Sequence, residues 1–246
     1  MESDLDNTTD EVDIAAWERL SAEELLRTLS HHYGQRVAIG TSFQKSGLVL
    51  IDMAYRNQIP LRVFTIDTLR LPAETHHLMD TIQERYGFEL ESFTPQPEAV
   101  QRMIQDHGEY LFFDSVAKRE YCCKIRKTEP NGRALDTVDA WVTGLRRDQS
   151  SQRSETPRIQ HIKRGGRTLH KVAPIANWTE ADVDAYIEKH AIPQNDLFSR
   201  GYRTIGCTIC SSPVLPWEDQ RAGRWRWEKQ ESAKECGLHL EHGAGI

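Results

Sequence analysis

The sequence contains no long hydrophobic run and few cysteines. Its apolar stretches are broken by polar residues well short of the roughly 20 residues that a membrane-spanning helix needs. Basic residues are missing before Trp17, where six acidic ones occur, which is the opposite of a secretory or transit peptide. We therefore expect a soluble, cytoplasmic protein without membrane attachment. Structural disulfides are disfavoured in that compartment, so the five cysteines become candidates for metal binding or catalysis.

The sequence also lacks an excess of positive charge. Its net charge is −6, which argues against broad affinity for nucleic acid, and we expect no nucleic-acid partner. Basic residues are concentrated at 146–153 and 221–229, which leaves local anion binding open. Trp225 and Trp227 are two residues apart and cannot share one helical face. We therefore expect the tryptophans of this region to divide between core and surface rather than to stack nucleic-acid bases.

Alternating strand and helix patterns dominate the first 150 residues. A capping box formed by Ser21 and Glu24 predicts a helix start. Strands are expected within 36–43, 62–68, 88–93 and 139–147, and helices within 45–57, 72–87, 97–108 and through the paired cysteines. This alternation predicts right-handed crossovers and a mostly parallel sheet flanked by helices, which is the α/β class. After residue 155 we expect a hairpin that turns at Gly165 and Gly166, and then a capped helix ended by Pro193.

Polar loops follow three of the predicted strands: TSFQKSG, DTLRLP and GLRRDQSSQR. Ligands of parallel sheets bind beyond the carboxyl ends of the strands, and hydroxyl, amide and guanidinium groups there suit a phosphate-bearing ligand. We take Ser42, Lys45, Thr68 and Arg70 as candidate substrate-binding residues of the first two loops. Each loop alone could equally be a helix cap. The first is no Walker loop, since GxxxxGK[ST] is absent.

The five cysteines fall into a pair, a CxxC and a singleton. Two clusters of two thiolates supply four ligands, which suit a tetrahedral zinc or an iron–sulfur cluster. The side chains of adjacent cysteines diverge and converge poorly on one small ion, whereas a cubane offers separate iron corners. We therefore favour [4Fe–4S] over zinc, with Cys122, Cys123, Cys207 and Cys210 as ligands. Buried, unliganded thiols are the plainer alternative.

The singleton, Cys236, has two interpretations. A lone cysteine near a C-terminus is often inert. Lys234 and His239, however, are cations that could lower the pKa of its thiol. We add His239 to the candidate substrate-binding residues.

The motifs YCCKIRK, GCTICSSPV and ECGLH, with the three loops above, resemble those of assimilatory adenylyl-sulfate (APS) reductases in the phosphoadenylyl-sulfate (PAPS) reductase family. The resemblance covers about residues 35–240. It implies the adenine-nucleotide α-hydrolase-like fold, a [4Fe–4S] cluster on the four paired cysteines, and Cys236 as the catalytic nucleophile. It also implies that Lys127 lies beside cluster and substrate. The basic residues expected to meet the phosphosulfate group are Arg146, Arg147, Arg221 and Arg224.

The chemistry implies a thiol-dependent oxidoreductase. A thiolate that attacks the sulfur of APS expels AMP and leaves an S-sulfocysteine, and a second thiol then releases sulfite and forms a disulfide. If four of the five cysteines are ligands, the second thiol must come from a dithiol carrier such as thioredoxin or glutaredoxin. Because two thiols supply both electrons, we expect the cluster to act by position and electrostatics.

This interpretation divides the chain into three parts. Residues 1–20 are an acidic segment expected to be disordered, 21–216 form the α/β nucleotide-binding and iron–sulfur domain, and 217–246 form a mobile C-terminal segment that carries the nucleophile. The sequence leaves open whether the chain forms a homo-oligomer.

Three alternatives remain. PAPS is the first, because nothing in the composition distinguishes a 3′-hydroxyl from a 3′-phosphate; the cluster-bearing members of the family prefer APS. A tRNA-thiolating ATP-pyrophosphatase is the second, although TSFQKSG lacks the double glycine of the SGGKDS-like loop. The third is a non-enzymatic iron–sulfur sensor or scaffold, which would leave Cys236 and the arginine clusters without a purpose.

Overall fold

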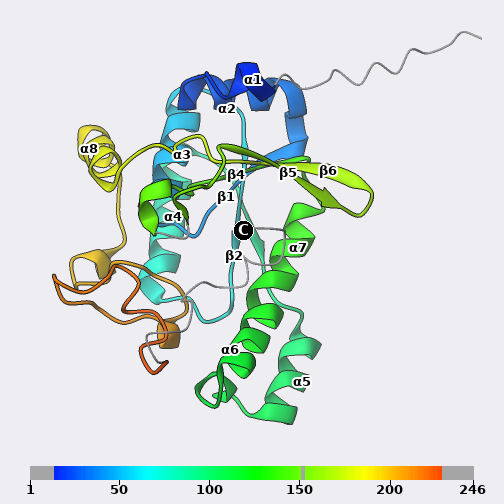
Figure 1. Cartoon of the computed structure of the whole chain (residues 1–246), viewed down its shortest axis with the longest axis vertical. Helices are drawn as coiled ribbons and strands as arrows, with labels where there is room; N and C mark the ends of the chain where they lie inside the picture. The colour runs from blue at the N-terminus through cyan, green and yellow to red at the C-terminus, as the bar shows by residue number, and fades with distance from the viewer. Residues whose placement is uncertain (1–13, 151–152, 229–246) are drawn as a thin grey trace, which may run out of the picture.

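A six-stranded sheet in the order β3-β2-β1-β4-β6-β5 forms the centre of the computed structural model, which describes residues 14–150 and 153–228 (Figure 1). The strands are β1 (Val37–Gly40), β2 (Arg62–Ile66), β3 (Leu90–Phe93), β4 (Ala140–Thr143), β5 (Ile159–Arg164) and β6 (Arg167–Val172). All neighbours pair in parallel except β5 and β6, which form the antiparallel hairpin. The predicted α/β class, the mostly parallel sheet and the hairpin are therefore confirmed.

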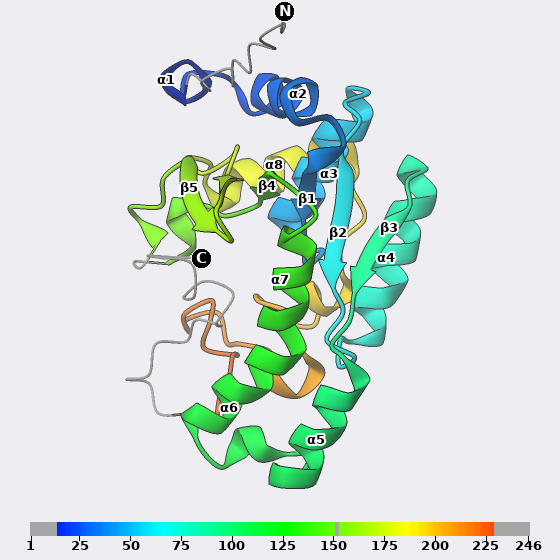
Figure 2. The same ribbon diagram turned by 90° about the vertical axis from the view of Figure 1, so that its right-hand side faces the viewer.

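Helices cover both faces of the sheet. They are α1 (Ile14–Trp17), α2 (Ala22–Tyr33), α3 (Lys45–Arg56), α4 (Ala73–Tyr86), α5 (Pro97–His107), α6 (Val116–Cys123), α7 (Glu129–Leu135) and α8 (Glu180–His190). Successive strand residues point to opposite faces. Accordingly Ile39 belongs to a core cluster with residues of α2, α3, α4 and α8, whereas Ala38 belongs to a second cluster with Ala134 and Leu135 of α7. Figure 2 shows α7 along one side of β1 and β2.

One continuous helical path carries the paired cysteines. A π-helical segment, Lys124–Thr128, joins α6 to α7. A π segment shifts the side chains after it around the helix axis, and such segments are frequent at functional sites. The expected helix through the cysteines is confirmed, but its wider turn was not predicted because π-helices leave no simple periodic pattern.

Residues 14–20, which belong to the segment expected to be disordered, include α1. Trp17 of this helix is buried, and its ring packs edge-on against His32 and Tyr33 at the end of α2. The favourable burial of this large aromatic side chain explains why residues 14–20 are ordered although the sequence before them is acidic. No helix within residues 14–150 and 153–228 is both long and apolar enough to cross a membrane.

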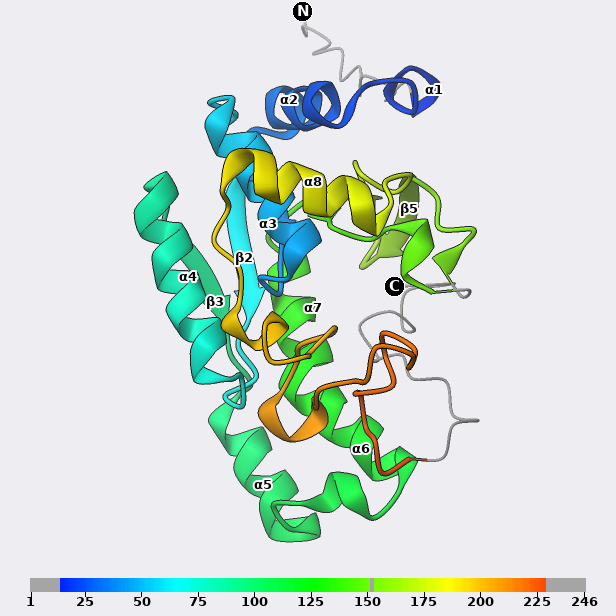
Figure 3. The same cartoon turned by 90° about the vertical axis from the view of Figure 1, so that its left-hand side faces the viewer.

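The chain after α8 returns along the carboxyl ends of the central strands (orange in Figure 3). It contains two short 3₁₀ turns, Asp196–Phe198 and Thr208–Cys210. The second turn contacts the loop after β2, because the Thr208 amide donates to the carbonyl of Arg70 at 2.8 Å. This return path brings the CxxC motif towards the helix that carries Cys122 and Cys123.

Candidate active site

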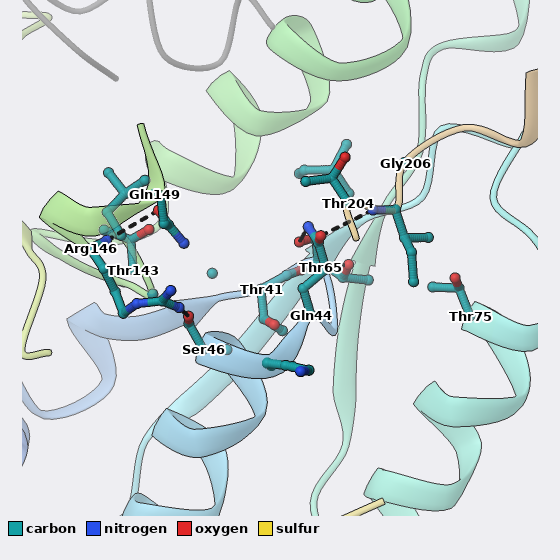
Figure 4. A pocket seen from close by; sticks show the side chains of 18 of the residues that line it. Thr41, Gln44, Ser46, Thr65, Thr75, Thr143, Arg146, Gln149, Thr204 and Gly206 are labelled. Atoms are coloured by element: carbon teal, nitrogen blue, oxygen red, sulfur yellow. Dashed lines mark hydrogen bonds between the residues drawn. The ribbon is translucent and has the colours of Figure 1, made fainter. Parts of the chain in front are cut away.

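A cavity of about 520 Å³ opens at the carboxyl ends of β1, β2 and β4 (Figure 4). Its walls come from the loops after these strands, the π segment and α7, and the returning segment 198–224. Seven predicted substrate-binding residues line it: Ser42, Lys45, Thr68, Lys127, Arg146, Arg221 and Arg224. The structure thus brings together residues that lie up to 182 positions apart in the sequence (224 − 42).

The loop after β1 positions the N-terminus of α3 at this cavity. Phe43 adopts a positive φ of 54°, and its amide donates to the Thr41 hydroxyl at 2.9 Å. Gly47 is required beside this turn, because a Cβ atom there would lie 2.2 Å from the Thr41 Oγ1 atom. Gln44 then accepts from the amide of Ile205 at 3.1 Å, which ties the loop to the returning segment (Figure 4). The first turn of α3 therefore faces a cavity that suits an anion.

Arg146 and Arg147 are adjacent in sequence but have different surroundings. Arg146 is buried in the cavity wall, where it donates to the Ser46 hydroxyl at 2.5 Å and to the Asp148 carboxylate at 2.9 Å. Arg147 does not line the cavity, and its guanidinium donates instead to the carbonyl of Thr156 at 2.9 Å. Only the first of the two arginines is therefore in a position to influence a ligand there.

A second, smaller cavity is lined by all four paired cysteines. Cys122 and Cys123 end α6, while Cys207 precedes the second 3₁₀ turn and Cys210 ends it. Further lining comes from aromatic and basic residues, including Arg70, Arg119, Arg126 and Trp225. Lys127 and Arg224 line both cavities, so these two cations connect the cysteines to the larger cavity.

Two kinds of metal centre commonly use four thiolate ligands. The described parts of the chain contain no group of three or more His, Cys, Asp or Glu side chains that could hold a single metal ion. Tetrahedral zinc needs its sulfur ligands to converge to about 2.3 Å from one ion. A cubane instead accepts one thiolate at each of four separate irons. The four cysteines that line one cavity are a ligand set of the kind that such a cluster uses.

Three buried N–H donors in the walls of the cysteine cavity support the same assignment. They are Nη1 of Arg119, Nε of Arg126 and Nε1 of Trp225, and none finds a hydrogen-bond partner among the residues that the structure describes. Buried polar groups in proteins are nearly always hydrogen-bonded. A sulfur-rich, negatively charged group in this cavity would provide the acceptors, so the residues present fit an iron–sulfur cluster.

Electrostatics differ among the four thiols. Burial opposes ionisation of Cys207, but Lys127 and the hydroxyl of Thr68, at 3.2 Å from the sulfur, outweigh it and lower the pKa of this thiol. Burial raises the pKa of the Cys122 and Cys210 thiols. The thiolate form is therefore favoured at Cys207 and disfavoured at Cys122 and Cys210.

The remaining predicted residues lie elsewhere or outside the described chain. Arg70 belongs to the wall of the smaller cavity, where its guanidinium lies 5.3 Å from the centre of the Phe112 ring. Cys236 and His239 lie outside the described residues, as does the proposed mobile segment beyond residue 228.

Two parts of the wall of the larger cavity were not predicted from the sequence. The stretch 202–206 lines it beside the loop after β1, and Asn131 and Trp141 line it on the side covered by α7. An asparagine in a helix and a tryptophan in a strand carry no signal of a site. The structure explains the glycine that precedes the CxxC motif, because a Cβ atom on Gly206 would lie 2.1 Å from Nη1 of Arg224.

Comparison with known proteins gives consistent matches over most of the chain. Residues 36–213 match the phosphoadenosine phosphosulfate reductase domain family. The chain is 43% identical over 223 residues to an adenosine 5′-phosphosulfate reductase of Burkholderia cepacia, which covers 91% of this chain and 87% of that protein. A second adenosine 5′-phosphosulfate reductase, from Allochromatium vinosum, is 42% identical over 203 residues, with 82% and 78% covered.

Solved structures agree with these matches. The phosphoadenylyl-sulfate reductase of Candida auris, in complex with phosphate, superposes with a TM-score of 0.66 at 30% identity, covering 80% of this chain and 91% of that chain. The FMN adenylyltransferase of Candida glabrata superposes with a TM-score of 0.53 at 15% identity, covering 84% and 69%. The second likeness shows a shared fold only.

Proposed function

Because the chain belongs to the phosphoadenosine phosphosulfate reductase family, we propose that it is an adenylyl-sulfate reductase that forms sulfite and AMP with electrons from a thiol donor. One observation carries this proposal above the others. A cavity of nucleotide size meets a cavity of four cysteines, and Lys127 and Arg224 belong to the walls of both. Their charges suit a substrate whose anionic end must lie close to the sulfur-lined cavity.

Substrate binding would rest on the walls of the larger cavity. Its volume of about 520 Å³ lies within the range of roughly 300–1,000 Å³ found for small-molecule sites. Ser42 and the first turn of α3 offer hydrogen-bond donors, and Lys127, Arg221 and Arg224 supply positive charge for the phosphosulfate group. Lys45 is already paired with Asp184 at 2.7 Å, so its charge would act on the ligand in balance with a carboxylate.

Cys122, Cys123, Cys207 and Cys210 are the residues that would hold a [4Fe–4S] cluster. When bound, such a cluster would supply a fixed, polarisable charge beside the substrate. The chain's own part is to hold the four sulfurs around one cavity and to direct buried N–H groups towards it. Lys127 would share its charge between this cavity and the anionic end of the substrate.

The bond-making step is assigned to Cys236. Its thiolate attacks the sulfur of adenylyl sulfate, the bond between sulfur and the bridging oxygen breaks, and AMP leaves with that electron pair. A carrier thiolate then attacks the Cys236 sulfur, and sulfite leaves as the disulfide forms. A second carrier thiol, as in thioredoxin or glutaredoxin, releases Cys236 as a thiolate. Cys236 lies eight positions after Glu228, a reach of at most about 28 Å.

Phosphoadenylyl sulfate is the second candidate substrate, because the similar Candida auris structure is a phosphoadenylyl-sulfate reductase. The two nucleotides differ only at the 3′ position of the ribose. Ratios of kcat/KM for the two substrates decide between them, and we expect adenylyl sulfate to be preferred. The thiols that the reaction needs stay reduced in the cytoplasm, which is the compartment we propose.

A single-turnover experiment tests the proposal. Anaerobically prepared protein is incubated with adenylyl sulfate and no thiol, and its peptides are analysed by mass spectrometry. We expect one sulfonate on Cys236 for each AMP released, and no AMP from a Cys236→Ser variant. Release of AMP without sulfonation of Cys236, or no turnover when a thiol carrier is added, would refute the proposal.

A further inference from the structure

A buried ion pair connects the cysteine-bearing helix to the last residue that the structure describes. Arg119 of α6 donates to the carboxylate of Glu228 through Nε at 2.9 Å and Nη2 at 3.3 Å. Only 2% of the Arg119 side chain and 5% of the Glu228 side chain are exposed. Burial of two charges carries a large desolvation cost, so such a pair adds little stability compared with apolar packing. A role in fixing the position of the chain at Glu228 explains the buried ion pair better than a role in stability.

The chain between Trp225 and Glu228 has further anchors on the same structure. Trp225 is fully buried, and the guanidinium carbons of Arg119 and Arg224 lie 4.3 and 5.0 Å from the centre of its ring. Its amide donates to the carbonyl of Cys210 at 3.3 Å. These contacts fix the direction in which the chain leaves the cysteine cavity.

Arg119 also reaches the cysteines themselves. It lies three and four residues before Cys122 and Cys123, and helical residues at these spacings share one face. Its third nitrogen, Nη1, is buried in the wall of the cysteine cavity and has no hydrogen-bond partner within residues 14–150 and 153–228. Arg119 thus binds the start of the C-terminal segment through two nitrogens, belongs to the wall of the sulfur-lined cavity, and keeps its third nitrogen buried without a hydrogen-bond partner among the described residues.

We infer that Arg119 is a positioning residue that couples the cysteine cavity to the segment carrying Cys236. Through Glu228 it fixes the point from which eight residues lead to the nucleophile, and through Nη1 it ties that point to whatever occupies the cavity. The inference rests on the function proposed above. It gives the ion pair a role in aligning Cys236 with substrate, separate from substrate binding.

Glu228→Gln tests this coupling most cleanly, because it keeps the shape of the side chain and removes its charge. In single-turnover reactions with adenylyl sulfate we expect sulfonation of Cys236 to slow on the order of 10²-fold, the usual effect of misplacing a reacting group by about 1 Å. The affinity for AMP, measured by calorimetry, and the visible absorption of the protein should not change. Arg119→Lys should slow the reaction similarly and also alter the visible absorption, because Nη1 is lost.

Glu218→Gln is the matched control. Glu218 forms a bidentate pair with Arg226 at 2.8 and 2.9 Å in the same segment, but neither residue lines the two cavities. This variant should react at the wild-type rate. If Glu228→Gln does not fold, Glu228→Asp, which keeps the charge but shortens the side chain, should still slow sulfonation.

The outcomes distinguish a failure of the coupling from a failure of the proposed function. A folded Glu228→Gln or Glu228→Asp variant that sulfonates Cys236 at the wild-type rate overturns the coupling and leaves the proposed function intact. A wild-type protein that never sulfonates Cys236 overturns the proposed function, and the coupling with it. A weakened affinity for AMP that accounts for the whole loss of rate also overturns the coupling, since the pair would then act on binding.

Discussion

The close approach of Arg224 to Gly206 leaves no room for a side chain, which makes a quantitative test of the site possible. A Cβ atom at this position would lie 2.1 Å from Nη1, 2.5 Å from Nη2 and 2.7 Å from Cζ of Arg224. Carbon and nitrogen atoms without a bond stay well beyond 3 Å, so Gly206→Ala must displace the guanidinium by roughly 1 Å. Gly206 has no positive φ, so alanine adds no backbone strain of its own.

Arg224 cannot make room at no cost. It is 5% exposed, and its Nη1 donates to the Ser211 hydroxyl at 2.6 Å. Loss of a hydrogen bond by a buried charged group costs about 1–3 kcal/mol, which is the expected loss in the free energy of unfolding for Gly206→Ala. Because Arg224 lines both cavities, AMP binding should weaken as well.

A double-mutant cycle with Arg224→Ala supplies the control. In that background the obstacle is absent, so Gly206→Ala should change the free energy of unfolding by only a few tenths of a kcal/mol. Urea unfolding measures all four proteins, and calorimetry with AMP follows the site. Equal costs of Gly206→Ala in both backgrounds would show that the alanine acts elsewhere and would refute the reasoning.

Three further predictions concern charges in the core and at the cavities. Burial opposes ionisation of Asp52, but donors that include Arg56 hold the pKa of its carboxyl below the usual range. The ionised carboxylate therefore contributes to the free energy of unfolding above about pH 4, and this contribution is lost as the pH falls through the folded pKa. Asp52→Asn should cost about 1.5–3 kcal/mol at pH 7 in urea unfolding, and an equal cost at pH 3 would contradict this. Burial lowers the pKa of Lys171 to about 8, so between about pH 8 and 10.5 the unfolded chain binds one more proton than the folded chain. The free energy of unfolding should therefore rise with pH in this window by up to about 3 kcal/mol relative to that of Lys171→Met. A difference between the two proteins that does not change with pH would argue against this burial. Lys127→Met should weaken AMP binding about tenfold and reduce its salt dependence in calorimetry, whereas the exposed Lys124→Met should do neither, and equal effects would count against a local contact.

Elements with their own local signal were predictable from sequence. The Ser21 capping box, the left-handed Gly87 that ends α4 and the turn at Gly165 and Gly166 all lie where the pattern placed them. The helix expected to end at Pro193 ends earlier, at His190, because Ala191 adopts a left-handed conformation. Boundaries depend on such single residues, whereas the existence of an element depends on a whole pattern.

The part of the site that was predictable from the sequence is the group of cysteines, because binding one metal centre requires its ligands to lie together. Four thiols have few uses in the reduced compartment that we expect from the sequence, and the structure places all four paired cysteines around one cavity. Trp225 lies in the core whereas Trp227 is 36% exposed, which agrees with the argument from their spacing. The directions of Arg146 and Arg147 were not predictable, because they depend on the backbone just after β4. Nor could the sequence reveal the buried pair of Arg119 and Glu228, which are 109 residues apart.

We propose that four cysteines hold a cluster while the fifth, Cys236, makes and breaks bonds. Native mass spectrometry of anaerobically purified protein, before and after addition of adenylyl sulfate, tests both halves in one experiment. We predict a chain that carries four iron and four sulfide ions and then gains one sulfonate, which fragmentation locates at Cys236 while the metal content stays constant. A chain that carries a single zinc ion, or a sulfonate on any of the paired cysteines, would contradict the account.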